Sequence, residues 1–241
     1  MSRSTLGAVQ NAEWAEFLGN AIGGLHVAAD ELKLRRAKYE AKKDWFRKGK
    51  AGIPQEEAVS RALADLFAYR RAQQALSDPA NGDVDLRHIS IACETPRPLD
   101  PGISKQAKPT DYTIILMRES ELDLRIEAKT VLDEREIKAE YLGLRGLKRF
   151  DDASNPYTIS SYGGMVAYVV DHDAPTWSTK ISTAVLAEIG QDRASSIELG
   201  ARKHHVSKHN IPVATREMTG NIEVNVVHFV LEVEASPSRR T

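Results

Sequence analysis

Residues 108–131 carry the sequence KPTDYTIILMRESELDLRIEAKTV, which predicts a β-hairpin. Apolar side chains alternate along both of its arms, as they do in strands with one buried face. The alternating residues are Tyr112, Ile114 and Leu116 in the first arm and Leu122, Leu124 and Ile126 in the second. A polar loop at residues 118–120 joins the two arms and has the length of a three-residue hairpin connection.

The register of this hairpin follows from its apolar residues, because a slip of one residue would turn every side chain to the other face. Pairing Met117 with Glu121 keeps all six apolar residues on the buried face. It also sets Asp111 opposite Glu127, with Lys129 two residues farther along on the same polar face. The same register pairs Ile115 with Asp123 and Thr113 with Arg125.

Asp111, Glu127 and Lys129 form a group that suits metal-assisted hydrolysis of a phosphodiester. Two carboxylates directly opposite each other repel, and a divalent cation with oxygen ligands would offset that repulsion. A neighbouring lysine supplies positive charge to a developing oxyanion, or helps to orient or deprotonate an attacking water. The alternative is a solvated hairpin face that carries ordinary charges.

The Glu-x-Lys pattern also begins at Glu31, Glu40 and Glu136. Those three lie in segments predicted to be helical, where residues i and i+2 point in different directions. Only Glu127 lies on a predicted strand, where residues i and i+2 share a face.

Asp111, followed sixteen residues later by Glu127-Ala128-Lys129, resembles the signature of the PD-(D/E)XK, or restriction-endonuclease-like, nuclease superfamily. The resemblance covers residues 54–170, and Pro109-Thr110-Asp111 departs from the literal Pro-Asp. It implies an α/β fold with a mixed central sheet flanked by helices. It also implies a metal-dependent endonuclease in bacterial restriction or anti-phage defence, with DNA favoured over RNA as the substrate. In that arrangement Asp111, Glu127 and the Ala128 carbonyl hold Mg²⁺ or Mn²⁺, and Lys129 orients and activates water.

A helix predicted over residues 54–76 supplies a candidate third acid. Many members of the superfamily carry a glutamate on the helix before the sheet. Glu56 lies near the edge of the apolar face and is the first choice, whereas Glu57 points largely away and is the reserve. Acids in the first helical turn also complement the helix dipole, which is the alternative explanation for either one.

Composition sets the class of protein. The chain has 241 residues, a hydrophobic fraction of 41% and a formal net charge of −1, which suit one elaborated domain, or one domain with an appendage, and a real core. Near neutrality argues against non-specific coating of nucleic acid but allows a local basic channel. The lone Cys93 and the absence of a signal segment or spanning apolar run lead us to expect a cytoplasmic protein.

Three regions are predicted along the chain: a helical, partly basic appendage at residues 1–52, a nuclease-like domain at 53–235 and a flexible tail at 236–241. In the first region a helix is expected over residues 9–50, with a bend or break at Gly23-Gly24. Lys42 and Lys43 belong to a basic run that suits backbone phosphate contacts. A solvated helix face or a dimer-forming appendage explains the same charges.

Further elements follow the hairpin. We expect a helix over residues 132–150 interrupted at Gly143 and Gly146, a strand buried on both faces at 164–170, a helix at 176–191 and a late strand at 221–233 at or near the sheet edge. Weaker candidates for phosphate contact are Arg145, Lys148 and Arg149, and Lys208 in a predicted polar loop. His205 and His209 have the spacing of a helical metal pair, but no third ligand completes such a site.

Two functional alternatives remain open. The first is a catalytically silent nuclease-like subunit that binds nucleic acid or a partner ATPase or helicase, against which the intact Asp111, Glu127 and Lys129 argue. The second is a small-molecule enzyme of unrelated fold, but no glycine-rich phosphate loop or nucleophile elbow supports it. A homodimer is also compatible with the N-terminal region.

Overall fold

The computed structural model describes residues 3–42, 44–48, 50, 52–77, 79–80, 83–96, 109–117, 122–152, 157–170, 173–214 and 219–233. The helices are α1 (Arg3–Leu34), α2 (Arg36–Glu40), α3 (Glu56–Gln74), α4 (Glu134–Glu136) and α5 (Ala174–Ile189). Three single-turn segments are the π-helical η1 (Ile137–Tyr141) and the 3₁₀ turns η2 (Leu147–Asp151) and η3 (Gln191–Arg193). The strands are β1 (Ile89–Pro96), β2 (Pro109–Leu116), β3 (Asp123–Thr130), β4 (Tyr162–Val169), β5 (Ala194–Leu199), β6 (Arg202–Ala214) and β7 (Thr219–Glu232).

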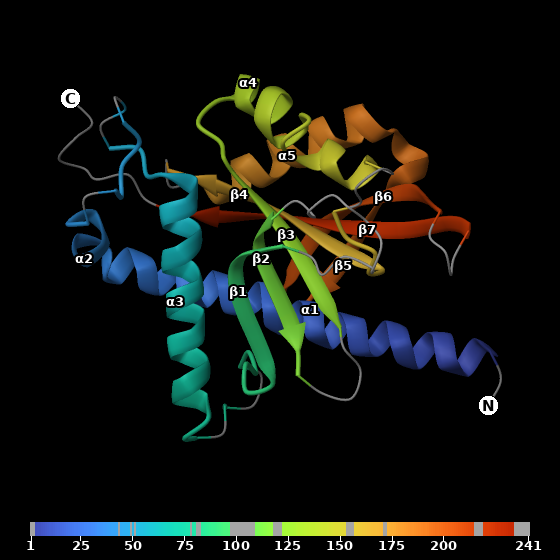
Figure 1. Cartoon of the computed structure of the whole chain (residues 1–241), viewed down its shortest axis with the longest axis horizontal. Helices are drawn as coiled ribbons and strands as arrows, with labels where there is room; N and C mark the ends of the chain where they lie inside the picture. The colour runs from blue at the N-terminus through green and yellow to red at the C-terminus, as the bar shows by residue number, and fades with distance from the viewer. Residues whose placement is uncertain are drawn as a thin grey trace.

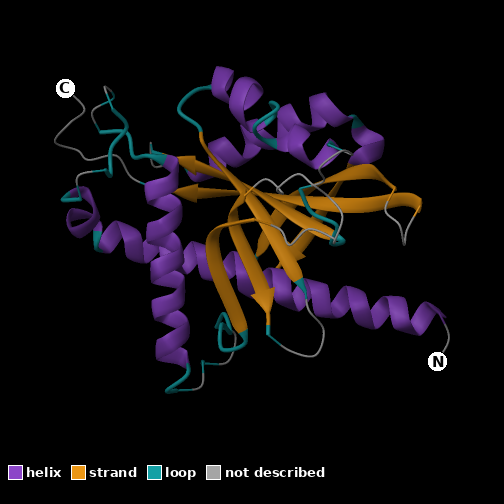
Figure 2. Cartoon of the chain, viewed as in Figure 1, coloured by secondary structure: helices purple, strands orange, loops and turns teal. Residues whose placement is uncertain are grey.

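One mixed sheet organises these elements. Its seven strands run in the order β1-β2-β3-β4-β7-β6-β5. The β3–β4 and β4–β7 pairs are parallel and all other pairs are antiparallel. Helices α1 and α3 cover one face, while η1, η2 and α5 cover the other (Figures 1 and 2). The expected α/β architecture with a mixed sheet flanked by helices is therefore confirmed.

The β2–β3 hairpin has the predicted register. Thr113 pairs with Arg125 and Ile115 with Asp123. All six alternating apolar residues are buried in one hydrophobic cluster with α1 and α3. Tyr112 pairs with Ile126, so Asp111 and Glu127 are the next residues along their strands, on the opposite face. The connecting loop lies outside the described residues.

Helix α1 is part of the core, so the expected N-terminal appendage is wrong for this helix. Its apolar residues, from Trp14 to Leu32, share one cluster with α3 and the sheet. The helix also continues through Gly23-Gly24, where a bend or break was expected. A Cβ on Gly23 would lie 2.7 Å from Val84, and one on Gly24 would lie 2.8 Å from Leu86 and overlap the Phe67 ring. These glycines allow close packing and do not break the helix.

Gly24 and Gly19 give a matched test of this packing. Gly24→Ala is expected to lower the free energy of unfolding by about 3 kcal/mol, because the added methyl group has no space. Gly19→Ala meets no atom within 4 Å and should be neutral or stabilising by up to about 1 kcal/mol. Urea unfolding of both variants checks this. Equal effects at the two positions would contradict the close approach of α1 to α3.

The basic run after α1 is not one helix to residue 50. Helix α2 ends at Glu40, and Phe46 forms an isolated bridge with Pro54. Tyr39 and Trp45 are buried in the hydrophobic cluster with α1 and α3, and their ring centroids lie 5.7 Å apart. Helix α3 begins at Glu56, two residues after the proline expected in its first turn.

Strands β6 and β7 correct two further expectations. The segment that contains His204, His205 and His209 is a strand and not a polar loop, because it pairs with β5 on one side and β7 on the other. The spacing of His205 and His209 is therefore not that of a helical metal pair. Strand β7 lies between β4 and β6 and not at the edge. It carries buried residues on both faces, with Val226 and Val230 on one and Val227, Phe229 and Leu231 on the other.

The region from 132 to 151 is interrupted as expected. Helix α4 and η1 end at Tyr141, and η2 resumes at Leu147. A Cβ on Gly143 or Gly146 would overlap the carbonyl oxygen of Ala139 or Tyr141, respectively. The tight turn between these glycines therefore needs residues without side chains. Among the described residues no helix is both long and apolar enough to cross a membrane.

Candidate active site

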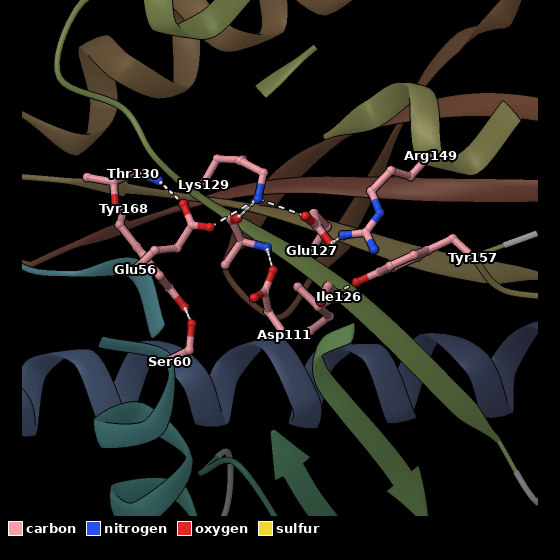
Figure 3. Close-up of polar contacts among 11 residues, drawn as sticks. Glu56, Ser60, Asp111, Ile126, Glu127, Lys129, Thr130, Arg149, Tyr157 and Tyr168 are labelled. Atoms are coloured by element: carbon pink, nitrogen blue, oxygen red, sulfur yellow. Dashed lines mark hydrogen bonds and ion pairs between the residues drawn. The ribbon is translucent and has the colours of Figure 1, made fainter. Parts of the chain in front are cut away.

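The polar face of the hairpin brings Asp111, Glu127 and Lys129 together, and the first turn of α3 adds Glu56 (Figure 3). Asp111 Oδ2 accepts a hydrogen bond of 2.7 Å from the backbone N–H of Ala128. This bond ties the end of β2 to β3 beyond the last paired residues. The structure thus places all four predicted catalytic side chains at one site.

Lys129 is the centre of the group. Its Nζ donates to the Ala128 carbonyl at 2.7 Å and lies 2.7 Å from Glu127 Oε1 and 3.0 Å from Glu56 Oε1. The lysine side chain is only 9% exposed. Three oxygen partners hold the buried ammonium of Lys129 in one position, so its positive charge is fixed beside the carboxylates.

Glu127 lies between two cations. Its Oε1 faces Lys129, and its Oε2 accepts a hydrogen bond from Arg149 Nη1. The Arg149 guanidinium stacks over the Tyr157 ring, 4.8 Å from its centroid. Tyr157 in turn donates to the Ile126 carbonyl at 3.0 Å. Arg149, a predicted phosphate contact, therefore pairs with Glu127, one of the predicted catalytic carboxylates.

Both carboxylate oxygens of Glu56 have a partner, and Oε1 lies 3.0 Å from Lys129 Nζ. Its Oε2 accepts a 2.9 Å hydrogen bond from the backbone N–H of Thr130, at the end of β3. One turn along α3, the Ser60 hydroxyl lies 2.9 Å from the Tyr168 hydroxyl, which also contacts the buried hydroxyl of Tyr112. Glu57 is exposed and lines the same cleft. The choice of Glu56 over Glu57 agrees with this geometry, because only Glu56 contacts Lys129.

Burial and the neighbouring charged groups shift the pKa values of Asp111 and Lys129. Burial, with the nearby charge of Glu127, raises the pKa of Asp111 to about 7. Burial opposes the charged form of Lys129, but Glu127, Glu56 and Asp111 together raise its pKa above the ordinary value. Lys129 is therefore an ammonium at neutral pH, whereas Asp111 still holds its proton in part of the molecules.

The oxygen donors fit Mg²⁺ or Mn²⁺ in chemical type. Burial first, and the nearby carboxylates of Glu127 and Glu56 after it, raise the pKa of Asp111, and a bound cation would favour its charged form. Within the described residues, however, no group of three or more His, Cys, Asp or Glu side chains is arranged to hold a metal ion. Lys129 Nζ contacts the Ala128 carbonyl and Glu127 Oε1, two of the oxygens that would hold such an ion. A metal at this place would share these oxygens with Lys129 or displace its ammonium.

The four side chains open into a cleft of about 680 Å³. It is lined by Glu56, Glu57, Arg61, Thr110, Asp111, Glu127, Lys129, Leu144, Arg145 and Arg149. A smaller hollow of about 280 Å³ shares Glu57 and Arg61 with it and also contains Lys42 and Trp45. Carboxylates on the floor and arginines on the rim suit a ligand that carries both phosphate and metal.

The predicted phosphate contacts separate into two groups. Arg145 and Arg149 line the cleft, and Lys42 lines the adjoining hollow. Lys148 instead lies 3.0 Å from Glu188 on α5, and Lys208 lies 3.6 Å from Glu223 on β7. Neither of these two lysines lines the cleft. Lys43 lies outside the described residues.

Sequence reasoning missed Arg61, Leu144 and Tyr157. Arg61 follows Glu57 by four residues on α3, a spacing that places two helical residues on the same side and could have identified it. Leu144 lies between the two glycines of the predicted interruption. No pattern distinguishes Tyr157, because its place beside Arg149 depends on tertiary packing alone.

Comparison with known protein families, with curated proteins and with solved structures finds no match for this chain. The residues of the site are therefore the basis for a proposal about function.

Proposed function

We propose that the chain is a metal-dependent nuclease that hydrolyses phosphodiester bonds of nucleic acid, with DNA as the favoured substrate. The observation that supports this most is the meeting of Asp111, Glu127, Glu56 and Lys129 in a cleft rimmed by Arg61, Arg145 and Arg149. Acidic oxygens beside a fixed ammonium provide ligands for a hard cation and positive charge for a developing phosphorane.

Each residue of the site would have a separate role in this reaction. A Mg²⁺ or Mn²⁺ ion held by Asp111, Glu127 and the Ala128 carbonyl would supply Lewis acidity and lower the pKa of a bound water. Lys129 remains protonated, so it orients the water and stabilises negative charge, and it does not remove the proton itself. Glu56 keeps the ammonium directed at the cleft through its 3.0 Å contact. The rim arginines hold the phosphates on either side of the scissile bond.

A catalytically silent subunit is the second candidate, and one observation favours it. Lys129 and Arg149 already neutralise Glu127, and Lys129 also contacts the Ala128 carbonyl. Such a closed set of ion pairs does not need a metal. The protein would then bind nucleic acid, or a partner ATPase or helicase, through the same cleft without cutting.

Cleavage of plasmid and single-stranded DNA separates the two candidates. Wild-type protein with Mg²⁺ or Mn²⁺ should cut, EDTA should stop the reaction, and Lys129→Ala should lower the rate by about 10²–10³-fold. A single-stranded RNA of the same length tests the preference for DNA. Equal cutting by both proteins would point to a contaminating nuclease or a different site. Silence of the wild type, combined with no heat of Mn²⁺ binding in calorimetry, would favour the binding-only subunit.

A further inference from the structure

A buried chain of hydrogen bonds runs beneath the face of the sheet opposite α1. The Tyr141 hydroxyl lies 3.0 Å from His228 Nδ1, and the Ser207 hydroxyl lies 2.8 Å from His228 Nε2. The same hydroxyl lies 2.9 Å from His209 Nε2, and His209 Nδ1 lies 2.8 Å from Asp151 Oδ1. Tyr141, Ser207 and His209 are fully buried and His228 is 4% exposed. The chain therefore links five side chains in a place that water does not reach, except at Asp151.

The two residues at the ends of this series of hydrogen bonds, Tyr141 and Asp151, flank one short segment of the polypeptide. Tyr141 closes η1 and Asp151 closes η2, so the hydrogen bonds fix the segment 142–150, here called the arch, to β6 and β7 at both ends. Phe150 adds a third fixed point, because a Cβ on Gly163 of β4 would lie about 2.5 Å from its ring. Such an element has little freedom to move relative to the sheet.

The arch has a buried side and an exposed side. Leu142, Leu147 and Phe150 are at most 4% exposed, whereas Leu144 is 83% exposed. Leu144 and its neighbour Arg145 line the cleft, and Arg149 connects the arch to Glu127. Leu144 is thus a large apolar side chain on a fixed turn at a cleft whose other lining residues are polar or charged.

We infer that the arch is a pre-positioned clamp for the substrate strand, in which Arg145 contacts a phosphate and Leu144 contacts an unstacked base. This rests on the proposed nuclease function. The apolar side chain of Leu144 cannot bind a charged phosphate favourably, so its partner on a nucleic acid is the apolar face of a base. In an intact duplex those faces are stacked inside, and apolar side chains reach them only by unstacking a step. A single strand or an opened duplex offers them directly.

Binding without cleavage tests the clamp. In EDTA, fluorescence anisotropy with a labelled single strand, an intact duplex and a duplex with a central bulge measures affinity. Leu144→Ser should weaken binding to the single strand and the bulged duplex by about tenfold and leave the duplex nearly unchanged. Arg145→Gln should weaken all three and reduce the salt slope by about one charge. Lys148→Gln is the matched control, since Lys148 belongs to the same arch but pairs with Glu188 away from the cleft.

The anchoring role of the buried chain has its own readout. Asp151→Ala removes the partner of His209, whereas Asp151→Asn keeps an acceptor oxygen and should restore binding. If Asp151 acts by holding the arch, Asp151→Ala and Arg145→Gln combined should weaken binding by less than the product of their separate effects. Full additivity would contradict the anchor, and equal loss in the Asn and Ala variants would assign the effect to charge.

Failure of the clamp and failure of the nuclease proposal give different results. A wild type that cuts DNA with Mg²⁺, combined with a Leu144→Ser variant that binds every probe equally well, would remove the clamp and leave the nuclease. A wild type that binds none of the three probes and cuts nothing would overturn both.

Discussion

Asp111→Asn is expected to slow cleavage by about 10³-fold and at the same time to stabilise the protein at pH 8. Burial and the charge of Glu127 raise the pKa of Asp111 from 3.8 to about 7. The folded state therefore binds this proton more tightly than the unfolded state does. The stability that Asp111 contributes is present below pH 4 and is lost as pH rises towards 7. Asparagine stays neutral and still offers an oxygen to the N–H of Ala128, so it avoids that loss.

The size of the stabilisation can be bounded. A shift of this extent corresponds to at most about 4 kcal/mol for a fully buried group, and partial exposure reduces the expected gain to about 2 kcal/mol. Urea unfolding of wild type and Asp111→Asn at pH 4 and pH 8 measures it. The two proteins should be alike at pH 4 and differ at pH 8. The cleavage rate should fall by about 10³-fold, because a charged oxygen ligand is lost. If Asp111→Asn were less stable than wild type at pH 8, the ionised Asp111 would be favourable in the folded state, and its pKa would not be raised.

Glu127→Gln is expected to lose cleavage to a similar extent but to destabilise the protein. Glu127 is 2% exposed and faces both Lys129 and Arg149. Removing its charge leaves two largely buried cations short of a partner, which costs about 3 kcal/mol. The neighbouring carboxylates thus have opposite effects on stability, although both serve the same proposed reaction.

The same unfolding experiment at pH 8 checks this contrast. Glu188→Gln is a suitable control, because its partner Lys148 forms an exposed pair on the far side of the arch and should contribute less than about 1 kcal/mol. Equal stability of Glu127→Gln and wild type would mean that the two cations find solvent or other partners. The opposite signs at positions 111 and 127 would then no longer hold.

The hairpin and its site could be predicted because both depend on local alternation. Six apolar residues on one face allow one register, and that register places Asp111 beside Glu127 without any knowledge of the rest of the fold. Glu56 could be predicted from the sequence for a similar reason, because helical periodicity places it and Glu57 on different sides of the helix. In each case the signal lies within one or two adjacent elements.

The remaining features depend on contacts between distant segments. The polar run around His205 and His209 predicts a loop, yet it is a strand that pairs with β5 and β7. The buried His209 is accommodated there because Ser207 and Asp151 hydrogen-bond to its ring. Gly23-Gly24 predicts a break, yet α1 continues because Phe67 and Val84 need the space. Arg149 was a candidate phosphate contact, with a solvated helix end as the alternative, but the fold places it on Glu127. These partners are far apart in the sequence, so the local pattern of residues cannot predict their contacts.

The central position of β7 bears on how the protein is made. Strands β1–β4 and β5–β6 are joined in the sheet only through β7, which follows all of them in the chain. A ribosome releases the N-terminal part first, so the carboxylates of β2 and β3 emerge before the strand that closes the sheet. His228, which holds the arch, lies on that same late strand. A nascent chain would thus carry its acidic residues without an assembled cleft, and any activity against nucleic acid would begin only after β7 has been synthesised and has inserted.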